Sequence, residues 1–486
     1  MKNKIVKLLF VGGVAALSLQ SCTDLTEKVY DRIEDGDFLK NDAQIAAALG
    51  PAYGGLGGIT WDWFNPNEAS SDEMIVPTRG GDWFDNGDWL AYSRHTWTPS
   101  HGPINGSWGF IFGNISTINQ LIPKVAANKK AVDELRALRA FYYLQAVDMF
   151  GNVPISTETL NDGATKPRAD VYAFIEKELL EITPNLPTTK VYSKINQNVA
   201  NMILAKLYLN AGVYKGAPEW QKAYDVLNKV IPNYSLEAST LANFTLQNQG
   251  SAENIWVVPY DSKTAEGMNF EMRTLHYENQ KTYGLGNSPW NGFCTLADFY
   301  NSFDDKDLRK KMWIAGQQYA ASGAELKDAK GAPLAFVADF KKDQMTDADP
   351  EYQVAGVRAQ KYEIQRNNPS PHQDNDFVIF RLSDAVLMKA EAALWLGKTA
   401  EAVTEMNKTR TRAGLTAATT IDKASLLAER GREMAWEGWR RSDLIRFGEF
   451  NKERKFMKNT KDYSLFPIPQ ARIDANPKLV QNPAYK

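Results

Sequence analysis

Apolar side chains that recur every three or four residues restrict this chain to a largely helical fold. The pattern is clearest in DELRALRAFYYLQAVDMFG, where a helix that ends near Gly151 would bury one face. That face carries Leu135, Leu138, Phe141, Tyr142, Gln145 and Met149. Asp133 is of a type that caps helix starts, so we expect it to begin this helix.

Further helices of the same kind are predicted along the chain, joined by short turns that favour antiparallel pairs. They cover residues 43–49, 108–122, 170–183, 196–211, 218–231, 384–396, 399–412 and 424–436. LAKLY, Leu204 to Tyr208, has the spacing of a first tetratricopeptide helix, and Ala223 is a small packing residue for the second. The predicted fold is therefore mainly α, a tetratricopeptide-like helix-pair scaffold (an α-α superhelix) with large irregular loop regions.

Two irregular stretches interrupt the helical pattern. The scaffold covers about 104–235 and 376–450, and the irregular part covers about 50–103 and 251–375. GGLGG, Gly54 to Gly58, is interpreted as a flexible turn, and Asn254 to Tyr260 as a strand. The C-terminal tail after the last helix is proline-rich, and we expect it to be extended.

The N-terminus predicts export. Three lysines precede an apolar run, Leu8 to Leu19, that is too short to span a bilayer. The run ends in LQSC, which is similar to a bacterial lipoprotein box, so residues 1–21 are predicted to be a signal peptide and Cys22 a lipidation site. The alternative is an ordinary secreted protein with a chance cysteine. The mature chain, 22–486, is predicted to form one domain.

Signatures of enzymes and of nucleic-acid binding are absent from the sequence. The four histidines lack metal-ligand spacing, and HExxH, CxxC, GxSxG and Walker motifs do not occur. A net charge of −2 gives no basic face for nucleic acid. We expect no enzyme activity, metal or cofactor. One alternative stays open, since carboxylates are plentiful and a pair of them would suffice for a glycoside hydrolase.

Tryptophans placed in polar, glycine-rich loops are the main functional signal. RGGDWFDNGDW (residues 79–89) and YGLGNSPWNGFC (residues 283–294) combine flat rings with short polar side chains. Indole faces stack on the C–H face of a sugar, while planar polar groups bond its hydroxyls. The predicted ligand-binding residues are Trp83, Trp89, Trp290, Asn291, Arg79, Asp82, Asp85, Asn86, Asp88 and Tyr283. Alternatively, each tryptophan anchors its own loop. We expect Trp83 to face the ligand and Trp89 to anchor.

The motif-like segment EMAWEGWRRSDLIRFGEF is interpreted as structural. Its charges can form ion pairs where the helix turns at Gly438. The residues concerned are Glu433, Glu437, Arg440, Arg441, Asp443 and Arg446. We therefore predict buried architecture here and not an active site.

Five segments of the chain resemble the SusD/RagB family of Bacteroidota outer-membrane lipoproteins. They are ELRALRAFYYLQAVDMFGNVP, ILAKLYLNAGVY, LSDAVLMKAEA, EGWRRSDLIRFG and FPIPQ, in family order along nearly the whole mature chain. The lipoprotein box and WNGFC fit as well.

The resemblance implies a non-catalytic, cell-surface lipoprotein that captures oligo- or polysaccharide for a SusC-like TonB-dependent transporter. It also implies that ligand contacts come from the loop after Ser71-Asp72-Glu73 and from the loop around WNG, here Arg79 to Trp89 and Tyr283 to Trp290. Besides the hydrolase, a helical-repeat scaffold for outer-membrane assembly remains an alternative.

Overall fold

The computed structural model describes residues 41–158, 163–458 and 461–486. The signal peptide and Cys22 lie outside these residues. The chain divides into two units, 1–46 and 47–486, and the described part of the first is the beginning of helix α2 (Asp42–Gly54). Residues 47–486 are described below.

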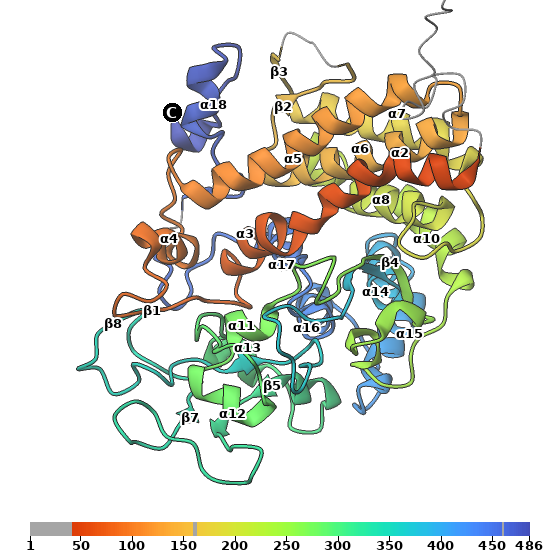
Figure 1. Cartoon of the computed structure of the whole chain (residues 1–486). Helices are drawn as coiled ribbons and strands as arrows, with labels where there is room; N and C mark the ends of the chain where they lie inside the picture. Colours follow the sequence, from red (N-terminus) through yellow and green to blue (C-terminus); the bar gives the residue numbers. More distant parts are fainter. Residues whose placement is uncertain (1–40, 159–162, 459–460) are drawn as a thin grey trace, which may run out of the picture. The chain divides into compact units, whose positions relative to one another are not determined.

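The scaffold of the second unit is a series of helices in which each packs on the next, as the sequence predicts (Figure 1). Its helices are α5 (Gly102–Leu121), α6 (Lys129–Met149), α7 (Arg168–Ile182), α8 (Gln197–Leu209), α9 (Ala211–Lys215), α10 (Trp220–Val230), α14 (Leu382–Trp395), α15 (Thr399–Arg412), α16 (Lys423–Met434) and α17 (Arg440–Phe447). Helix α10 packs against both α8 and α14, so it joins the two helical blocks of the sequence. Ala223, the predicted packing residue, is fully buried on α10.

The six apolar-face positions predicted for α6 are all buried, and so are Tyr143, Leu144 and Val147, so the helix is buried on more than the one predicted face. The predicted cap is wrong. Asn128 begins the helix, because its side chain accepts a hydrogen bond from the backbone N–H of Ala131 at 3.0 Å. Asp133 lies one turn inside, where its carboxylate bonds Lys129 Nζ at 2.8 Å.

The stretch 50–103 is more helical than its glycine and proline content predicts. It contains the end of α2, a 3₁₀ turn (Gly55–Gly58), a π-helical turn (Ile59–Trp63), α3 (Phe64–Ala69) and α4 (Asp88–Arg94). GGLGG is thus not a flexible turn: a Cβ on Gly55 would lie 1.7 Å from Asn114 Oδ1 of α5, so the glycine allows the two helical segments to touch. Tertiary packing overrides the weak helix propensity.

The second irregular stretch leaves the scaffold and returns to it through two paired strands. β4 (Asn254–Val258) and β10 (Phe377–Arg381) are antiparallel and entirely buried, which holds the two ends of the excursion together. Short helices lie along it: α11 (Phe270–Thr274), α12 (Gln280–Tyr283) and α13 (Ala297–Asn301). The C-terminal tail also differs from the prediction, because it forms α18 (Gln470–Ala475).

Short strand pairs connect the remaining segments. β1 (Thr78–Arg79) runs parallel to β8 (Gln344–Met345), and Ile75 forms an antiparallel bridge with Cys294. The other pairs are β2 (Val153–Pro154) with β3 (Thr165–Lys166), β5 (Trp313–Ile314) with β9 (Arg358–Ala359), and β6 (Gly316–Gln317) with β7 (Ala335–Phe336). The first irregular stretch is therefore fastened directly to the second.

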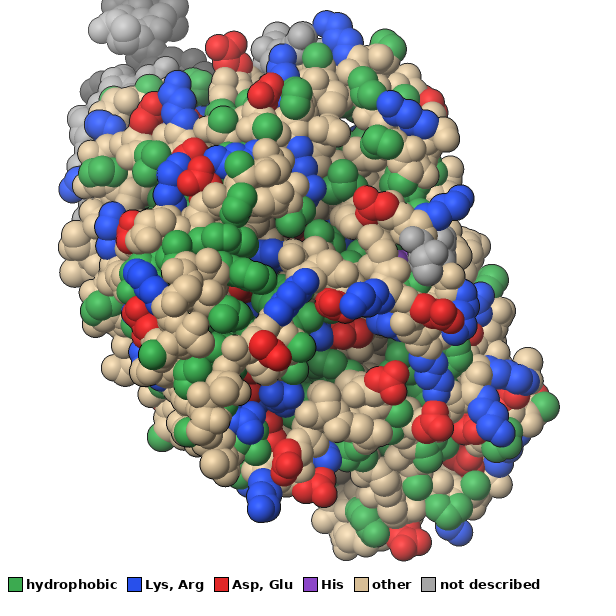
Figure 2. Space-filling model, turned by 180° about the vertical axis from the view of Figure 1, so that it is seen from behind, with side chains coloured by type: hydrophobic (Ala, Val, Ile, Leu, Met, Phe, Trp, Pro, Cys, Tyr) green, Lys and Arg blue, Asp and Glu red, His purple; other side chains and the backbone are tan. Residues whose placement is uncertain are grey.

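Charged side chains are buried in unusual number where α16 turns into α17. Arg381 binds Glu253, Glu433 and Glu437 at 2.7–2.8 Å, and Arg430 binds Asp443 at 2.8 Å. Gly438 adopts φ +82° at the turn, against the ring of Trp63. The prediction of buried architecture is confirmed, although most partners come from other segments. On the face in Figure 2, side chains of both charges are intermixed.

Candidate functional site

The loop 79–89 is held in place at its first residue. Arg79 is 1% exposed, and its guanidinium donates to the carbonyls of Asn291 at 2.7 Å and Ala355 at 2.8 Å. Beyond it, Gly80, Trp83, Asp85, Asn86 and Gly87 all have positive φ, a conformation that glycine and asparagine adopt readily and tryptophan does not. Because of these turns, the loop folds back and carries Trp83 toward the second loop.

The second loop is fixed through its backbone. The N–H groups of Trp290, Asn291 and Gly292 donate to the carbonyls of Met272, Leu275 and Arg273 at 2.6–2.9 Å. Asn291 is buried, and its amide is occupied by the carbonyl of Gln353 and the guanidinium of Arg358. Asn291 and the terminal nitrogens of Arg79 therefore hold the two loops together from within the protein.

The two tryptophan loops meet in space. The indole N–H of Trp83 donates to the carbonyl of Trp290 at 2.7 Å, and the two ring centroids lie 6.5 Å apart. Gly292 makes this approach possible, since a Cβ there would lie 2.3 Å from the indole of Trp83. Loops that are distant in the sequence thus form one surface.

This surface is a row of indole rings, which we call the aromatic platform and define as Trp61, Trp83 and Trp290. Trp61 is 44% exposed, Trp290 is 36% exposed and Trp83 is half-buried. Trp89 links them, with its centroid 6.1 Å from Trp61 and 5.3 Å from Trp83. Trp89 itself is 4% exposed and forms the floor together with Phe293. Large rings are seldom left exposed side by side without a ligand or partner.

The predicted acidic residues border the platform. Asp82 and Asp85 are exposed; Asp82 accepts a hydrogen bond from Tyr277, and Asp85 accepts one from the Trp89 indole at 2.8 Å. Asp88 lies 3.5 Å from His101, and burial raises the pKa of Asp88 and lowers that of His101. Asn86 is exposed at the loop tip.

Tyr283 lies apart from these rings. It is buried in a core cluster with Met272, Leu275, Leu285 and Ile364, and its hydroxyl faces Gln360 Oε1 at 3.3 Å. It lines a separate cavity of about 570 Å³. Of the predicted residues, therefore, two tryptophans and the exposed Asp and Asn side chains are at the platform surface, while Arg79, Asn291, Tyr283 and Trp89 are buried.

Three residues in or beside the platform, Trp61, Phe84 and Arg273, were not predicted from the sequence. Trp61 belongs to WDW in the first tryptophan-rich stretch, and Phe84, 43% exposed, follows Trp83 directly. Both are aromatic residues in the stretch already singled out, so the same signal would have found them. Arg273 is different: it is buried with its guanidinium 4.6 Å from the Trp61 ring centroid, and burial lowers its pKa to about 9. Nothing in the sequence pattern indicated that contact.

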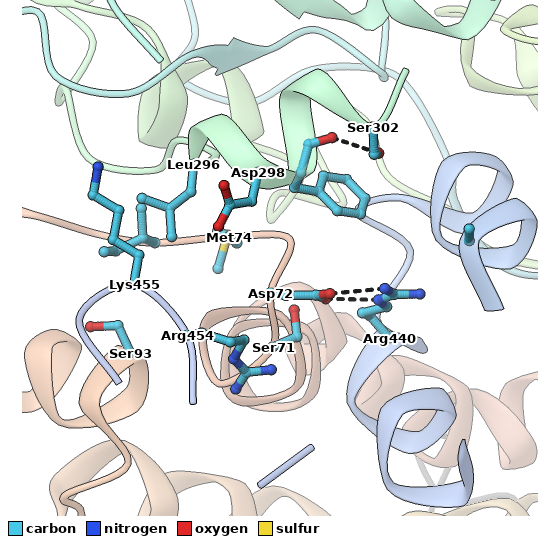
Figure 3. Close-up of a pocket in the computed structure, with 13 residues that line it drawn as sticks. Ser71, Asp72, Met74, Ser93, Leu296, Asp298, Ser302, Arg440, Arg454 and Lys455 are labelled. Atoms are coloured by element: carbon cyan, nitrogen blue, oxygen red, sulfur yellow. Dashed lines mark hydrogen bonds and ion pairs between the residues drawn. The ribbon is translucent and has the colours of Figure 1, made fainter. Parts of the chain in front are cut away.

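A cavity of about 220 Å³ lies beside Ser71 and Asp72, at the segment that precedes the loop (Figure 3). Its most prominent charges are paired, because Asp72 binds the guanidinium of Arg440 through two bonds of 2.7 and 2.8 Å. The platform rings do not line it. Within the described ranges, no group of three or more metal-ligating side chains was found, and no helix is long and apolar enough to cross a membrane.

Comparisons with known proteins agree on one family. The sequence profile of the SusD family matches residues 252–485. The chain is 25% identical to the starch-binding protein SusD of Bacteroides thetaiotaomicron and 24% identical to the SusD-like protein P38 of Formosa agariphila, with 100% of each chain covered in both cases.

Solved structures give the same result for the fold. A laminarin-binding SusD-like protein matches with a TM-score of 0.75 at 23% identity, covering 92% of this chain and 100% of that one. Surface glycan-binding protein A from Bacteroides thetaiotaomicron, in complex with laminarihexaose, matches with a TM-score of 0.73 at 20% identity, covering 91% and 99%. The fold belongs to the class of tetratricopeptide-like helical proteins with irregular loop regions. Within that class, the chain is similar to SusD-like proteins.

Proposed function

We propose that this protein binds oligo- or polysaccharide at the aromatic platform and does so without catalysis. The observation that carries the proposal is the exposure of Trp61 and Trp290 at the two ends of a row of contacting rings. A sugar ring stacks its C–H face on an indole, and Asp82, Asp85 and Asn86 offer acceptors at the edge. The relatives named for starch, laminarin and glycan binding support the same class of ligand.

The wider setting of this function is also a proposal. We infer that residues 1–21 are a signal peptide and that Cys22 carries lipid, so that the domain 22–486 is tethered to the outer membrane at the cell surface. We further propose that it passes glycan to a SusC-like TonB-dependent transporter. Similarity to SusD over the whole chain supports both statements.

The test is affinity electrophoresis of the purified chain, beginning at Thr23, in gels that contain individual soluble polysaccharides. We expect one class of polysaccharide to retard the chain and to quench its tryptophan fluorescence. Trp290→Ala is expected to migrate freely, whereas Trp395→Ala, a matched change of another exposed tryptophan on α14, is expected to be retarded like the wild type.

Two outcomes would overturn the proposal. If no polysaccharide retards the chain, the chain is not a glycan-binding protein. If Trp290→Ala is retarded as strongly as Trp395→Ala, glycan binds elsewhere. New reducing ends during long incubation with the bound polysaccharide would instead support the glycoside hydrolase alternative.

A further inference from the structure

We propose that the aromatic platform selects uncharged glycans and discriminates against glycans that carry carboxylate or sulfate groups. This inference rests on the proposed glycan-binding function and adds the class of ligand. It follows from which charged atoms a ligand on the rings would meet.

Carboxylates border the platform on the side of the first loop. Asp82 and Asp85 are exposed on either side of Trp83 and Phe84, and the Asp85 carboxylate is 2.8 Å from the indole nitrogen of Trp89. Asp88 follows one turn later with a side chain that is 23% exposed. Asp62 is half-buried directly after Trp61. A ligand that covers the row of rings therefore meets the exposed carboxylates of Asp82 and Asp85, while Asp62 and Asp88 are partly buried beside Arg273 and His101.

The two guanidiniums beneath this surface are turned inward. Arg79 and Arg273 are each 1% exposed. Arg79 donates to backbone carbonyls, and Arg273 donates to the carbonyl of Thr60 at 2.5 Å and to Asn65 Oδ1 at 3.2 Å. Although the Nε of each has no hydrogen-bond partner within the described part of the chain, both guanidiniums are buried and do not offer a ligand the bidentate contact that carboxylates and sulfates prefer.

The exposed cation of the adjoining helix is also engaged. Arg94, on α4, forms a two-bonded pair with Asp343 in which both distances are 2.7 Å. Its positive charge is therefore balanced by a carboxylate of the protein. Among the described residues, the exposed carboxylates of Asp82 and Asp85 form no ion pair, so the rim of the first loop is negative.

Hydroxyl groups and anionic groups respond to this rim in opposite ways. A sugar hydroxyl donates to a carboxylate, and a hydrogen bond to a charged acceptor is stronger than one between neutral groups. A carboxylate or sulfate on the sugar is repelled, and its water shell is removed without a cation to replace it. The acidic rim therefore strengthens the binding of neutral glycans and weakens the binding of acidic glycans.

The experiment compares each neutral glycan with a derivative that carries carboxylate groups. Each neutral polysaccharide of the panel is paired with its own carboxymethyl derivative at low substitution, and dissociation constants are measured by affinity electrophoresis at two salt concentrations. We expect the derivative of the bound polysaccharide to bind roughly tenfold more weakly than its parent. We expect the ratio to shrink at high salt, because exposed charges are screened.

A charge-reversal variant links the effect to the rim. Asp82→Lys is expected to reduce the discrimination between parent and derivative at least about threefold. The matched control is Asp305→Lys, the same change at a carboxylate whose side chain is 96% exposed in the segment after α13, and it is expected to leave the discrimination unchanged. Thermal unfolding of each variant confirms that it is folded.

The possible failures are distinguishable. A chain that binds neither parents nor derivatives overturns the proposed function and this inference together. A chain that binds derivatives as well as, or better than, their parents keeps the proposed function but overturns the selection of uncharged glycans. Unchanged discrimination in Asp82→Lys overturns the assignment to this rim.

Discussion

Charged side chains are usually exposed and large apolar side chains usually buried, and two regions of this molecule depart from this pattern in opposite ways. At the turn between α16 and α17, full charges are buried: Arg381, Glu433 and Glu437 are each at most 3% exposed. At the aromatic platform, indole rings are exposed. The buried charges have a structural explanation, because Glu433 and Glu437 each meet a guanidinium or ammonium group. The exposed rings have no comparable partner, and this contrast is why we assign ligand binding to the platform.

The contrast also shows how misleading a motif can be. EGWRRSD has the charged residues of an active site, yet the structure uses them to join segments: Arg440 binds Asp72, and Arg446 binds Glu391. Buried ion pairs are costly to desolvate and tolerate little change. Changes in such a region are expected to affect stability most, whereas changes at the platform are expected to affect binding most.

The largest effect is expected for Arg381→Met. It would leave three buried carboxylates without their shared cation, so we expect the free energy of unfolding to fall by about 3–5 kcal/mol in urea titrations. The matched control is Arg94→Met, which removes an ion pair whose arginine side chain is 36% exposed and is expected to cost at most about 1 kcal/mol. Equal losses in the two variants would mean that the buried network adds nothing beyond a surface pair.

The next prediction concerns pH. Burial raises the pKa of Glu68 from 4.5 to about 7, and its carboxylate accepts from the backbone N–H of Gly438 at the same turn. A raised folded-state pKa of an acid gives stability that is complete below pH 4.5 and is lost as pH rises through about 7.

Glu68→Gln removes that titration. Between pH 5 and 8 we therefore expect the variant to gain about 1–3 kcal/mol of unfolding free energy relative to the wild type. The difference between the two proteins is the quantity to measure, since burial lowers the pKa of His95 and of His276 to about 3 and those groups change stability in the opposite sense. A pH-independent difference would contradict the assignment.

Gly292→Ala tests how the two loops meet. The added Cβ would lie 2.3 Å from the Trp83 indole, so we expect displacement of that ring, a stability loss of about 1–3 kcal/mol and weaker glycan binding. Gly113→Ala on α5 is the control, since a Cβ there meets no atom within 4 Å. It is expected to be neutral or slightly stabilising in the helix. Wild-type affinity in Gly292→Ala would show that the ligand does not require Trp83 in this position.

The smallest effect is expected for Trp61→Ala. Its ring is 44% exposed at the end of the platform, and loss of one stacking face is worth about 0.5–1.5 kcal/mol, up to roughly tenfold in affinity. Calorimetric titration would detect it, and we expect some loss of unfolding free energy as well, because the ring also contacts Trp89 and Arg273. If Trp61→Ala binds with the affinity of the wild type, Trp61 does not contact the ligand and the binding surface comprises only Trp83 and Trp290.

Much of the fold follows from the sequence because helical periodicity is a local property. The helix predicted at 399–412 is α15 (Thr399–Arg412), and the apolar face of α6 is buried as its spacing predicts. The errors occur where distant contacts decide. Gly55 lies in a helical turn that packs on Asn114. Helix α6 begins after Asn128, a capping residue that precedes Asp133 in the sequence.

The candidate site was predictable in composition and not in geometry. Trp, Asp and Asn in two loops indicated a sugar surface, and the structure brings those loops together. Residue types did not tell which side chains hold the loops: Arg79 and Asn291 were predicted to bond a ligand edge, yet both are buried and hydrogen-bonded to the protein. Their partners include backbone carbonyls of distant segments, and a residue pattern does not show which carbonyls lie close to a given side chain.

The central claim is that the aromatic platform, and no other exposed tryptophan, binds the glycan. Its most direct test is calorimetric titration of the polysaccharide that retards the wild type into Trp290→Ala and Trp395→Ala side by side. The account predicts that Trp290→Ala binds at least about tenfold more weakly while Trp395→Ala keeps the wild-type dissociation constant. Wild-type affinity in Trp290→Ala, or loss of binding in Trp395→Ala alone, would contradict it.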